Sequence, residues 1–123
     1  MRALIVDDSS FIRQYMRQML QGLDIAVEEA IHGQMALEML AAGEAFDLTL
    51  LDVNMPVMGG LACVKALHED GRYRAMKVMM VTTEADNAFI CEALDYGADE
   101  FLMKPFTLES LRGKLVLMGL LGT

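Results

Sequence analysis

The chain has 123 residues and a formal net charge of −8, because 18 Asp and Glu outnumber 10 Lys and Arg. This length suits one domain with a substantial core, and a composition of 54% hydrophobic and 23% charged residues excludes a disordered chain. The acidic balance, without any basic run, argues against direct binding of nucleic acid, which requires clustered Lys and Arg side chains.

Apolar runs alternate with helical patterns five times along the chain. Taken in order, the runs predicted to form strands are 3–6, 25–30, 46–51, 76–81 and 100–103. The segments with apolar residues at helical spacing, predicted to form helices, are 11–23, 34–42, 61–70, 85–96 and 107–118. Ser9 or Ser10 is a suitable N-cap for the first helix, whose polar face carries Arg13 and Arg17.

Five strand–helix units in succession indicate a single α/β domain over residues 1–123. The strands are nearly all apolar, which is typical of a parallel sheet covered by helices on both faces. Right-handed crossovers then give an open, three-layer sandwich. The longest apolar stretch, 115–121, is too short to span a bilayer, and the first residues lack a signal-peptide pattern. We therefore expect a soluble, cytoplasmic protein without membrane insertion.

Polar residues follow four of the predicted strands at the point where each apolar run ends. They are Asp7 and Asp8, Asp52, Thr82, and Lys104. Because ligands of open α/β sheets bind outside the carboxyl ends of the strands, we expect these side chains to meet at one rim. Three carboxylates would repel one another there unless cations held them, and a divalent metal together with the Lys104 ammonium group fits that role.

Carboxylate oxygens, with no His or Cys at ligand spacing, favour Mg²⁺ or Mn²⁺ over zinc. Mg²⁺ commonly takes few protein ligands and completes its octahedron with water and phosphate oxygens, which indicates phosphate chemistry. Asp52 is the candidate nucleophile, because it stands alone at a central strand end and an aspartate can form an acyl phosphate. Mg²⁺, Lys104 and the Thr82 hydroxyl would stabilise the charge on the phosphoryl oxygens.

Other reactive side chains carry no comparable signal. Cys63 and Cys91 form no C-x-x-C motif, and we expect two reduced, largely buried thiols. His32 and His68 have no Ser, Cys or carboxylate partner at a suitable spacing. Most of the 12 methionines lie at apolar positions and are expected to fill the core, among them Met16, Met19, Met39 and Met79.

Four separated segments place the polar strand-end residues among characteristic neighbours. In chain order they are 4–9 (LIVDDS), 52–60 (DVNMPVMGG), 81–82 (VT) and 101–106 (FLMKPF). Together they resemble the receiver domain of two-component response regulators, of the CheY-like, single-domain kind, over essentially the whole chain. The resemblance implies a flavodoxin-like (βα)5 fold with five parallel strands in the order 2-1-3-4-5, a strand order for which a chemotaxis regulator of this family is a standard example.

The resemblance also implies a phosphorylation site. Asp52 would accept a phosphoryl group from the phosphohistidine of a sensor histidine kinase or of a histidine phosphotransfer domain. Mg²⁺ would be held by Asp8, Asp52 and the backbone carbonyl of Asn54, with Asp7 holding waters behind them. Lys104 would contact the phosphoryl group.

A switch is implied as well. The bond between Lys104 and Pro105 would be cis. On phosphorylation Thr82 would move inward, and Phe101, at the switch aromatic position, would rotate into the vacated space. This change would alter the surface of the fourth helix, fifth strand and fifth helix, where a downstream protein would bind.

Small departures from the family pattern are visible. Phe101 lacks the hydroxyl of the more familiar Tyr, and His32 replaces the Asn that precedes the glycine of the second helix. Asn54 and Glu84 match the pair found in enteric chemotaxis regulators. The resemblance implies that these two positions flank the phosphoryl group and tune its hydrolysis, so we expect a short-lived phosphorylated form.

The favoured function is a phosphorylation-activated signalling switch in a pathway such as chemotaxis, with only self-directed phosphotransfer and autodephosphorylation. A receiver cut from a larger regulator is an alternative, although Met1 directly before the first strand favours a true N-terminus. An aspartate-based small-molecule phosphatase would need an acid two residues after the nucleophile, where Asn54 stands, and a cap domain. A degenerate receiver used as a scaffold is disfavoured because every chemical residue is present.

Overall fold

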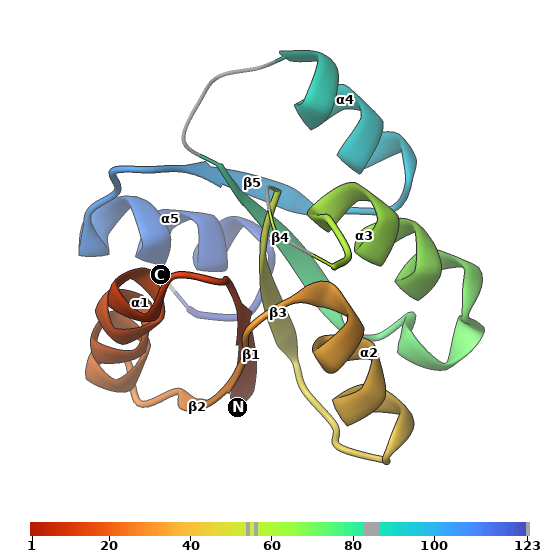
Figure 1. The fold of residues 1–123 in the computed structure, drawn as a ribbon. Coiled ribbons are helices and arrows are strands. Elements are labelled where there is room, and N and C mark those ends of the chain that lie inside the picture. Colours follow the sequence, from red (N-terminus) through yellow and green to blue (C-terminus); the bar gives the residue numbers. More distant parts are fainter. Residues whose placement is uncertain (54, 56, 83–86, 123) are drawn as a thin grey trace.

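The computed structural model describes residues 1–53, 55, 57–82 and 87–122. Within these ranges strands and helices alternate along the chain (Figure 1). The strands are β1 (Arg2–Val6), β2 (Ala26–Ala30), β3 (Leu48–Asp52), β4 (Lys77–Thr82) and β5 (Glu100–Met103). The helices are α1 (Ser10–Gly22), α2 (Gly33–Ala41), α3 (Gly60–Glu69), α4 (Asn87–Asp95) and α5 (Leu108–Leu117), with the 3-10 turn η1 (Gly71–Tyr73) before β4.

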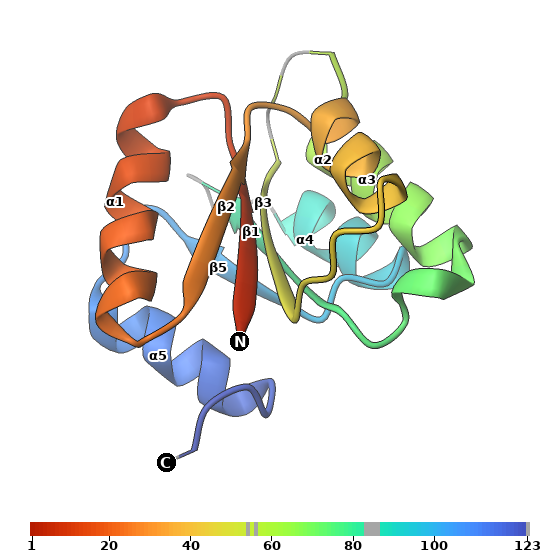
Figure 2. The same cartoon turned by 90° about the horizontal axis from the view of Figure 1, so that it is seen from below.

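The five strands form one parallel sheet in the order β2-β1-β3-β4-β5. Figure 2 shows α1 and α5 against one face of this sheet and α2, α3 and α4 against the other. Both faces are therefore buried, which explains why successive residues of β1, from Ala3 to Val6, are all fully buried. The predicted three-layer, flavodoxin-like architecture is confirmed.

Polar side chains define where several helices begin. The Ser9 hydroxyl accepts a hydrogen bond from the backbone N–H of Ile12, which confirms Ser9 as the N-cap of α1. At α2 the Nδ1 of His32 accepts a hydrogen bond from the backbone N–H of Met35, so His32 is the N-cap of this helix. A capping box of Thr107 and Ser110 starts α5.

The predicted bounds differ from the observed ones by one or two residues at most ends. The clearest difference is β3, which was expected at 46–51 and is found at Leu48–Asp52. Asp52 pairs in register with Val81 and is thus the last residue of the strand rather than the first beyond it. Phe46 instead packs below the Arg2 guanidinium, 4.5 Å from the ring centroid. The beginning of the predicted helix 85–96 lies outside the described residues.

The expectation of two buried thiols is wrong for one of them. Cys63 is fully buried on α3, whereas Cys91 is exposed on α4. Ala93 is buried on α4, and a residue two positions away points to the opposite side of a helix. Of the methionines expected in the core, Met16 and Met79 are buried, while Met19 and Met39 are half-buried against it.

None of the helices in the described part of the chain combines the length and the apolar character that crossing a membrane requires.

Candidate functional site

The carboxyl ends of four strands bring the predicted polar residues to one rim of the sheet. Asp7 directly follows β1, Asp52 ends β3, Thr82 ends β4, and Lys104 directly follows β5. Because β1, β3, β4 and β5 are consecutive in the sheet and parallel, their last residues lie side by side. The convergence expected from the sequence is therefore observed.

Three carboxylates form the centre of this rim. Asp7, Asp8 and Asp52 each offer one oxygen, and these three oxygens all lie within 4.8 Å of one another. Asp7 is only 1% exposed and Asp52 only 7%, whereas Asp8 faces solvent. Burying carboxylates together is unfavourable unless cations compensate them. A donor set made only of carboxylate oxygens fits Mg²⁺ or Mn²⁺.

Lys104 supplies one compensating charge. Its Nζ lies 2.9 Å from Oδ2 of Asp7 and 3.4 Å from Oδ1 of Asp52, and its side chain is only 13% exposed. The backbone N–H of Lys104 donates to the carbonyl of Thr82 at 2.6 Å, which ties the β5–α5 loop to the end of β4. The bond to Pro105 is cis, as the resemblance implies.

The two neighbouring aspartates differ in what their oxygens already bind. Both carboxylate oxygens of Asp7 accept hydrogen bonds, one from the N–H of Ser9 at 2.9 Å and one from Lys104. The Asp8 carboxylate makes no hydrogen bond to any residue in the described ranges and faces solvent. Asp8 is consequently the more available metal ligand of the pair, and Asp7 the more firmly positioned acid.

Arg13 is a contributor to the site that the sequence pattern did not reveal. Its Nη1 donates to the carbonyl of Asp7 at 2.9 Å, and its Nε donates to Glu29 at 2.9 Å. Arg17 binds the other oxygen of Glu29 at 2.7 Å. We expected Arg13 on a solvent-facing side of α1, but its side chain is only 16% exposed. The sequence showed only that Glu29, on the edge strand β2, has a charge opposite to that of Arg13. Charge alone gives no information on the distance between the two side chains.

Gly60, the first residue of α3, lies very close to the backbone that follows β3. A Cβ at this position would meet the carbonyl oxygen of Asp52 and lie 2.8 Å from the Cα of Val53. The N–H of Gly60 donates to the Val53 carbonyl at 2.9 Å. Glycine therefore lets the start of α3 pass directly beside the backbone of Asp52.

The remaining predicted residues are placed only in part. Thr82 is 7% exposed at the end of β4, one residue beyond the partner of Asp52 in the strand register. Phe101 is half-buried on β5, in register with Met80. Asn54 and Glu84 lie outside the described residues.

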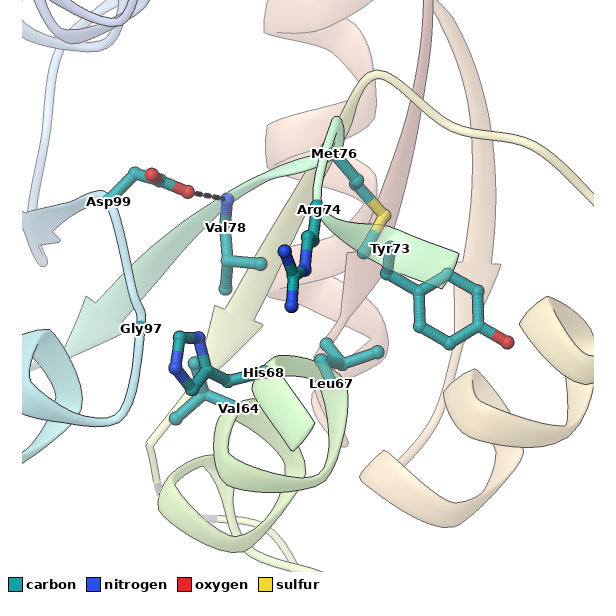
Figure 3. Close-up of a pocket in the computed structure, with 9 residues that line it drawn as sticks. All are labelled: Val64, Leu67, His68, Tyr73, Arg74, Met76, Val78, Gly97 and Asp99. Carbon is teal, nitrogen blue, oxygen red and sulfur yellow. Dashed lines mark hydrogen bonds between the residues drawn. The ribbon is translucent and has the colours of Figure 1, made fainter. Parts of the chain in front are cut away.

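Two of the hollows on the surface bear on the choice of the site. One, of about 540 Å³, adjoins Lys104 and is lined mainly by apolar side chains: Phe11, Ile12, Tyr15, Pro105 and Phe106. The other, of about 390 Å³, lies away from the acidic rim near the amino end of β4, where Arg74 and His68 line it (Figure 3). Its Asp99 carboxylate accepts from the N–H of Val78 at 2.8 Å and so serves the start of β4.

The sequence model of one protein family, the response regulator receiver domain, matches residues 3–116 of the chain. The chain belongs to this family. As a receiver domain it is a phosphorylation-activated signalling switch. It is 39% identical over 116 residues to the chemotaxis protein CheY1 of Helicobacter pylori, a match that covers 94% of each chain.

Solved structures agree with this assignment. The chemotaxis response regulator CheY4 of Vibrio cholerae is 38% identical, with a TM-score of 0.85 and 98% of each chain covered. A two-component system response regulator with a GGDEF domain is 29% identical with a TM-score of 0.88, and the match covers 98% of this chain but 50% of that one. The same fold thus occurs both alone and within longer proteins.

Proposed function

We propose that Asp52 is the residue that accepts the phosphoryl group, from the phosphohistidine of a sensor histidine kinase or a histidine phosphotransfer domain. The observation that carries this proposal is the Lys104 ammonium group, which bridges two buried carboxylates, Asp7 and Asp52. A lysine held there can exchange its contact with Asp52 for one with a phosphoryl oxygen. The reaction forms an O–P bond at Asp52, breaks the N–P bond of the donor, and leaves the donor imidazole to carry away the electron pair.

The acidic cluster is proposed to hold Mg²⁺, or Mn²⁺, through Asp8, Asp52 and the backbone carbonyl of Asn54. The metal would supply positive charge to the phosphoryl oxygens. Asp7, already bound by Ser9 and Lys104, would stay behind and hold metal-bound waters. The charges support this assignment, because three carboxylates are neutralised by one divalent ion and Lys104 together. The role of Asn54 rests on the family resemblance alone.

Thr82 and Phe101 are proposed to carry the signal away from Asp52. The Thr82 hydroxyl would donate to a phosphoryl oxygen and move inward, and Phe101 would rotate into the space it leaves. The affected surface is formed by α4, β5 and α5, which would bind the downstream protein. Chemotaxis is the pathway proposed, because the curated relatives reported above are chemotaxis proteins. The switch would act in the cytoplasm, with its own dephosphorylation, tuned by Asn54 and Glu84, as its only further reaction.

The apolar hollow beside Lys104 is proposed as part of the surface that meets the phosphodonor protein. A phosphohistidine can reach Asp52 only if its protein docks beside this rim. Phe11 lines the hollow and is 76% exposed, and exposed apolar patches of this kind favour protein contacts. A Phe11→Ser variant should therefore lose phosphotransfer from a kinase domain while retaining it from acetyl phosphate, which needs no docking.

Intact-mass measurement after treatment with acetyl phosphate tests the proposal. Wild type should gain the mass of one phosphoryl group in Mg²⁺ and none in EDTA. The Asp52→Ala variant should gain none in either, while an Asp47→Ala control, altered at an aspartate away from the rim, should behave as wild type. A metal-independent gain, or a gain that survives in Asp52→Ala, would contradict the assignment.

A further inference from the structure

Phe101 lies on the edge strand of the sheet, where it contacts α4 from one helical layer and α5 from the other. β5 is an edge strand, and the Phe101 side chain packs against the core cluster that includes Met80, Ala93 and Ala98. On the other side Lys114 of α5 places its Nζ 4.4 Å from the centroid of the Phe101 ring. At this distance an ammonium group is attracted to the face of an aromatic ring.

Glu100 fixes the position of that ammonium group. Its Oε1 accepts from the Nζ of Lys114 at 3.0 Å and also from the backbone N–H of Phe101 at 3.0 Å. The side chains of Lys114 and Glu100 are only 26% and 21% exposed, so solvent screens this pair less than a fully exposed one. One set of contacts thus links Glu100, Phe101 and Lys114.

We propose that Lys114 is a positioning residue that holds the Phe101 ring at the sheet edge and thereby opposes the phosphorylated state of the switch. This inference rests on the proposed function, in which phosphorylation draws the ring toward Thr82. A phenylalanine ring has no hydroxyl, and the negative face of its π system is the part that attracts the Lys114 ammonium group. A ring that turns inward leaves the Lys114 ammonium group and loses that attraction.

Thermodynamic reciprocity gives the consequence. If occupation of the Asp52 site favours the inward ring, then weakening the outward ring must favour occupation in return, by at most the factor by which the outward ring is weakened. Loss of the Lys114 contact should therefore tighten binding at the Asp52 site about two- to fivefold, the range expected of a partly exposed cation–π contact. Simple electrostatics predicts the opposite sign, because removing a positive charge weakens the binding of an anion.

Calorimetric titration with beryllofluoride, a phosphoryl mimic, at saturating Mg²⁺ separates these two effects. Lys114→Met should bind about two- to fivefold more tightly than wild type, and Lys114→Arg, which keeps a cation over the ring, should bind as wild type does. In a Phe101→Leu background the Lys114→Met change should no longer tighten binding. Unchanged or weaker binding by Lys114→Met, or tightening that persists with Phe101→Leu, would overturn the role of Lys114.

The ring itself provides a second readout. The chain has five phenylalanines, so fluorine NMR of protein labelled with 4-fluorophenylalanine is simple, and Phe101→Leu assigns the relevant signal. In the free protein, Lys114→Met should move that signal toward its position in the beryllofluoride complex. Wild type that binds no beryllofluoride would overturn the proposed function together with this role, whereas normal wild-type binding with no effect of Lys114→Met would overturn this role alone.

Discussion

The rim at the carboxyl ends of the strands and the hollow near the amino end of β4 both contain charged side chains, but they use them differently. At the carboxyl end, Asp7 and Asp52 are buried and share one lysine. In the hollow of Figure 3, Arg74 and His68 are exposed, and the Asp99 carboxylate serves the backbone of β4. The hollow near the amino end of β4 is therefore a poorer candidate site than the rim at the carboxyl ends of the strands.

This difference shows that buried charges of opposite sign in contact are better evidence for a functional site than exposed charges around a hollow. Moving a carboxylate out of water into the protein interior costs free energy, whereas an exposed carboxylate stays hydrated. A buried carboxylate is therefore stable only where nearby groups of opposite charge or hydrogen-bond donors offset that cost. The carboxyl rim meets this condition through Lys104 and gains from any further cation. The charged side chains that line the hollow near the amino end of β4 are exposed to solvent. Water therefore compensates their charges, and no partner is needed.

The largest expected effect comes from removing the shared lysine. Lys104→Met should lower the rate of phosphorylation by acetyl phosphate by about 10²- to 10³-fold, as is typical when one group that stabilises developing charge is lost. Arg74→Met, a matched loss of a cation at the other hollow, should leave the rate within about twofold of wild type. Equal losses in the two variants, measured by intact mass against time, would break the distinction between the two regions.

A smaller effect is expected from the backbone beside Asp52. Gly60→Ala should destabilise the fold by about 2–3 kcal/mol, because the new methyl group meets the backbone of β3. Gly59→Ala is the control, since its Cβ would come no closer than 3.6 Å to the Val53 carbonyl, and it should cost less than about 1 kcal/mol. Urea unfolding of both variants gives the comparison, and equal costs would show that the close approach at Gly60 is unimportant.

Cys63 shows what burial does to an acid that lacks a cation. Burial raises the pKa of the Cys63 thiol from 9.0 to about 12. The folded state therefore keeps a proton that the unfolded state loses above pH 9, so stability is complete below that pH and declines as pH rises. At pH 10.5 the loss should be about 2 kcal/mol relative to pH 7.

The Cys63→Ala variant isolates this effect. It should lack the portion of the alkaline decline that belongs to the thiol, whereas Cys91→Ala, altered at the exposed cysteine, should decline as wild type does. Denaturant unfolding measured from pH 7 to pH 10.5 provides the test. Parallel pH dependences for wild type and Cys63→Ala would rule out the raised pKa.

The smallest predicted effect concerns the loop that follows Asp52. Val57 has φ of 66°, a left-handed conformation that a β-branched residue rarely adopts, and its side chain is 78% exposed. Val57→Asn should stabilise the fold by about 1 kcal/mol, because Asn tolerates this conformation and little packing is lost. Val57→Thr keeps the branched Cβ and should bring no gain, and a thermal melt distinguishes the two variants.

The fold and the acidic rim could be predicted from the sequence because both follow from local patterns. Four of the five predicted strands end at a polar residue, and a parallel sheet brings such ends together without further information. Asp7, Asp52 and Lys104 were therefore placed correctly before any contact was known. The cis bond after Lys104 came from the family resemblance, because no periodicity reports on it.

The contacts made by helices could not be predicted in the same way. Arg13 reaches the Asp7 carbonyl, and Lys114 reaches Phe101, only because α1 and α5 have particular rotations about their axes. A helical pattern shows which side is apolar but not which neighbour a long polar side chain will meet. The exposure of Cys91 was missed for the same reason, since a small thiol does not define a helix face.

One measurement tests the central claim most directly. Borohydride reduces an acyl phosphate of aspartate to homoserine, so treatment of the phosphorylated protein followed by peptide mass mapping identifies the modified residue. We predict homoserine at position 52 and at no other aspartate, and only when Mg²⁺ was present during phosphorylation. Homoserine at position 7 or 8, or equal conversion without the metal, would contradict the assignment of Asp52 as the acceptor within a metal-binding rim.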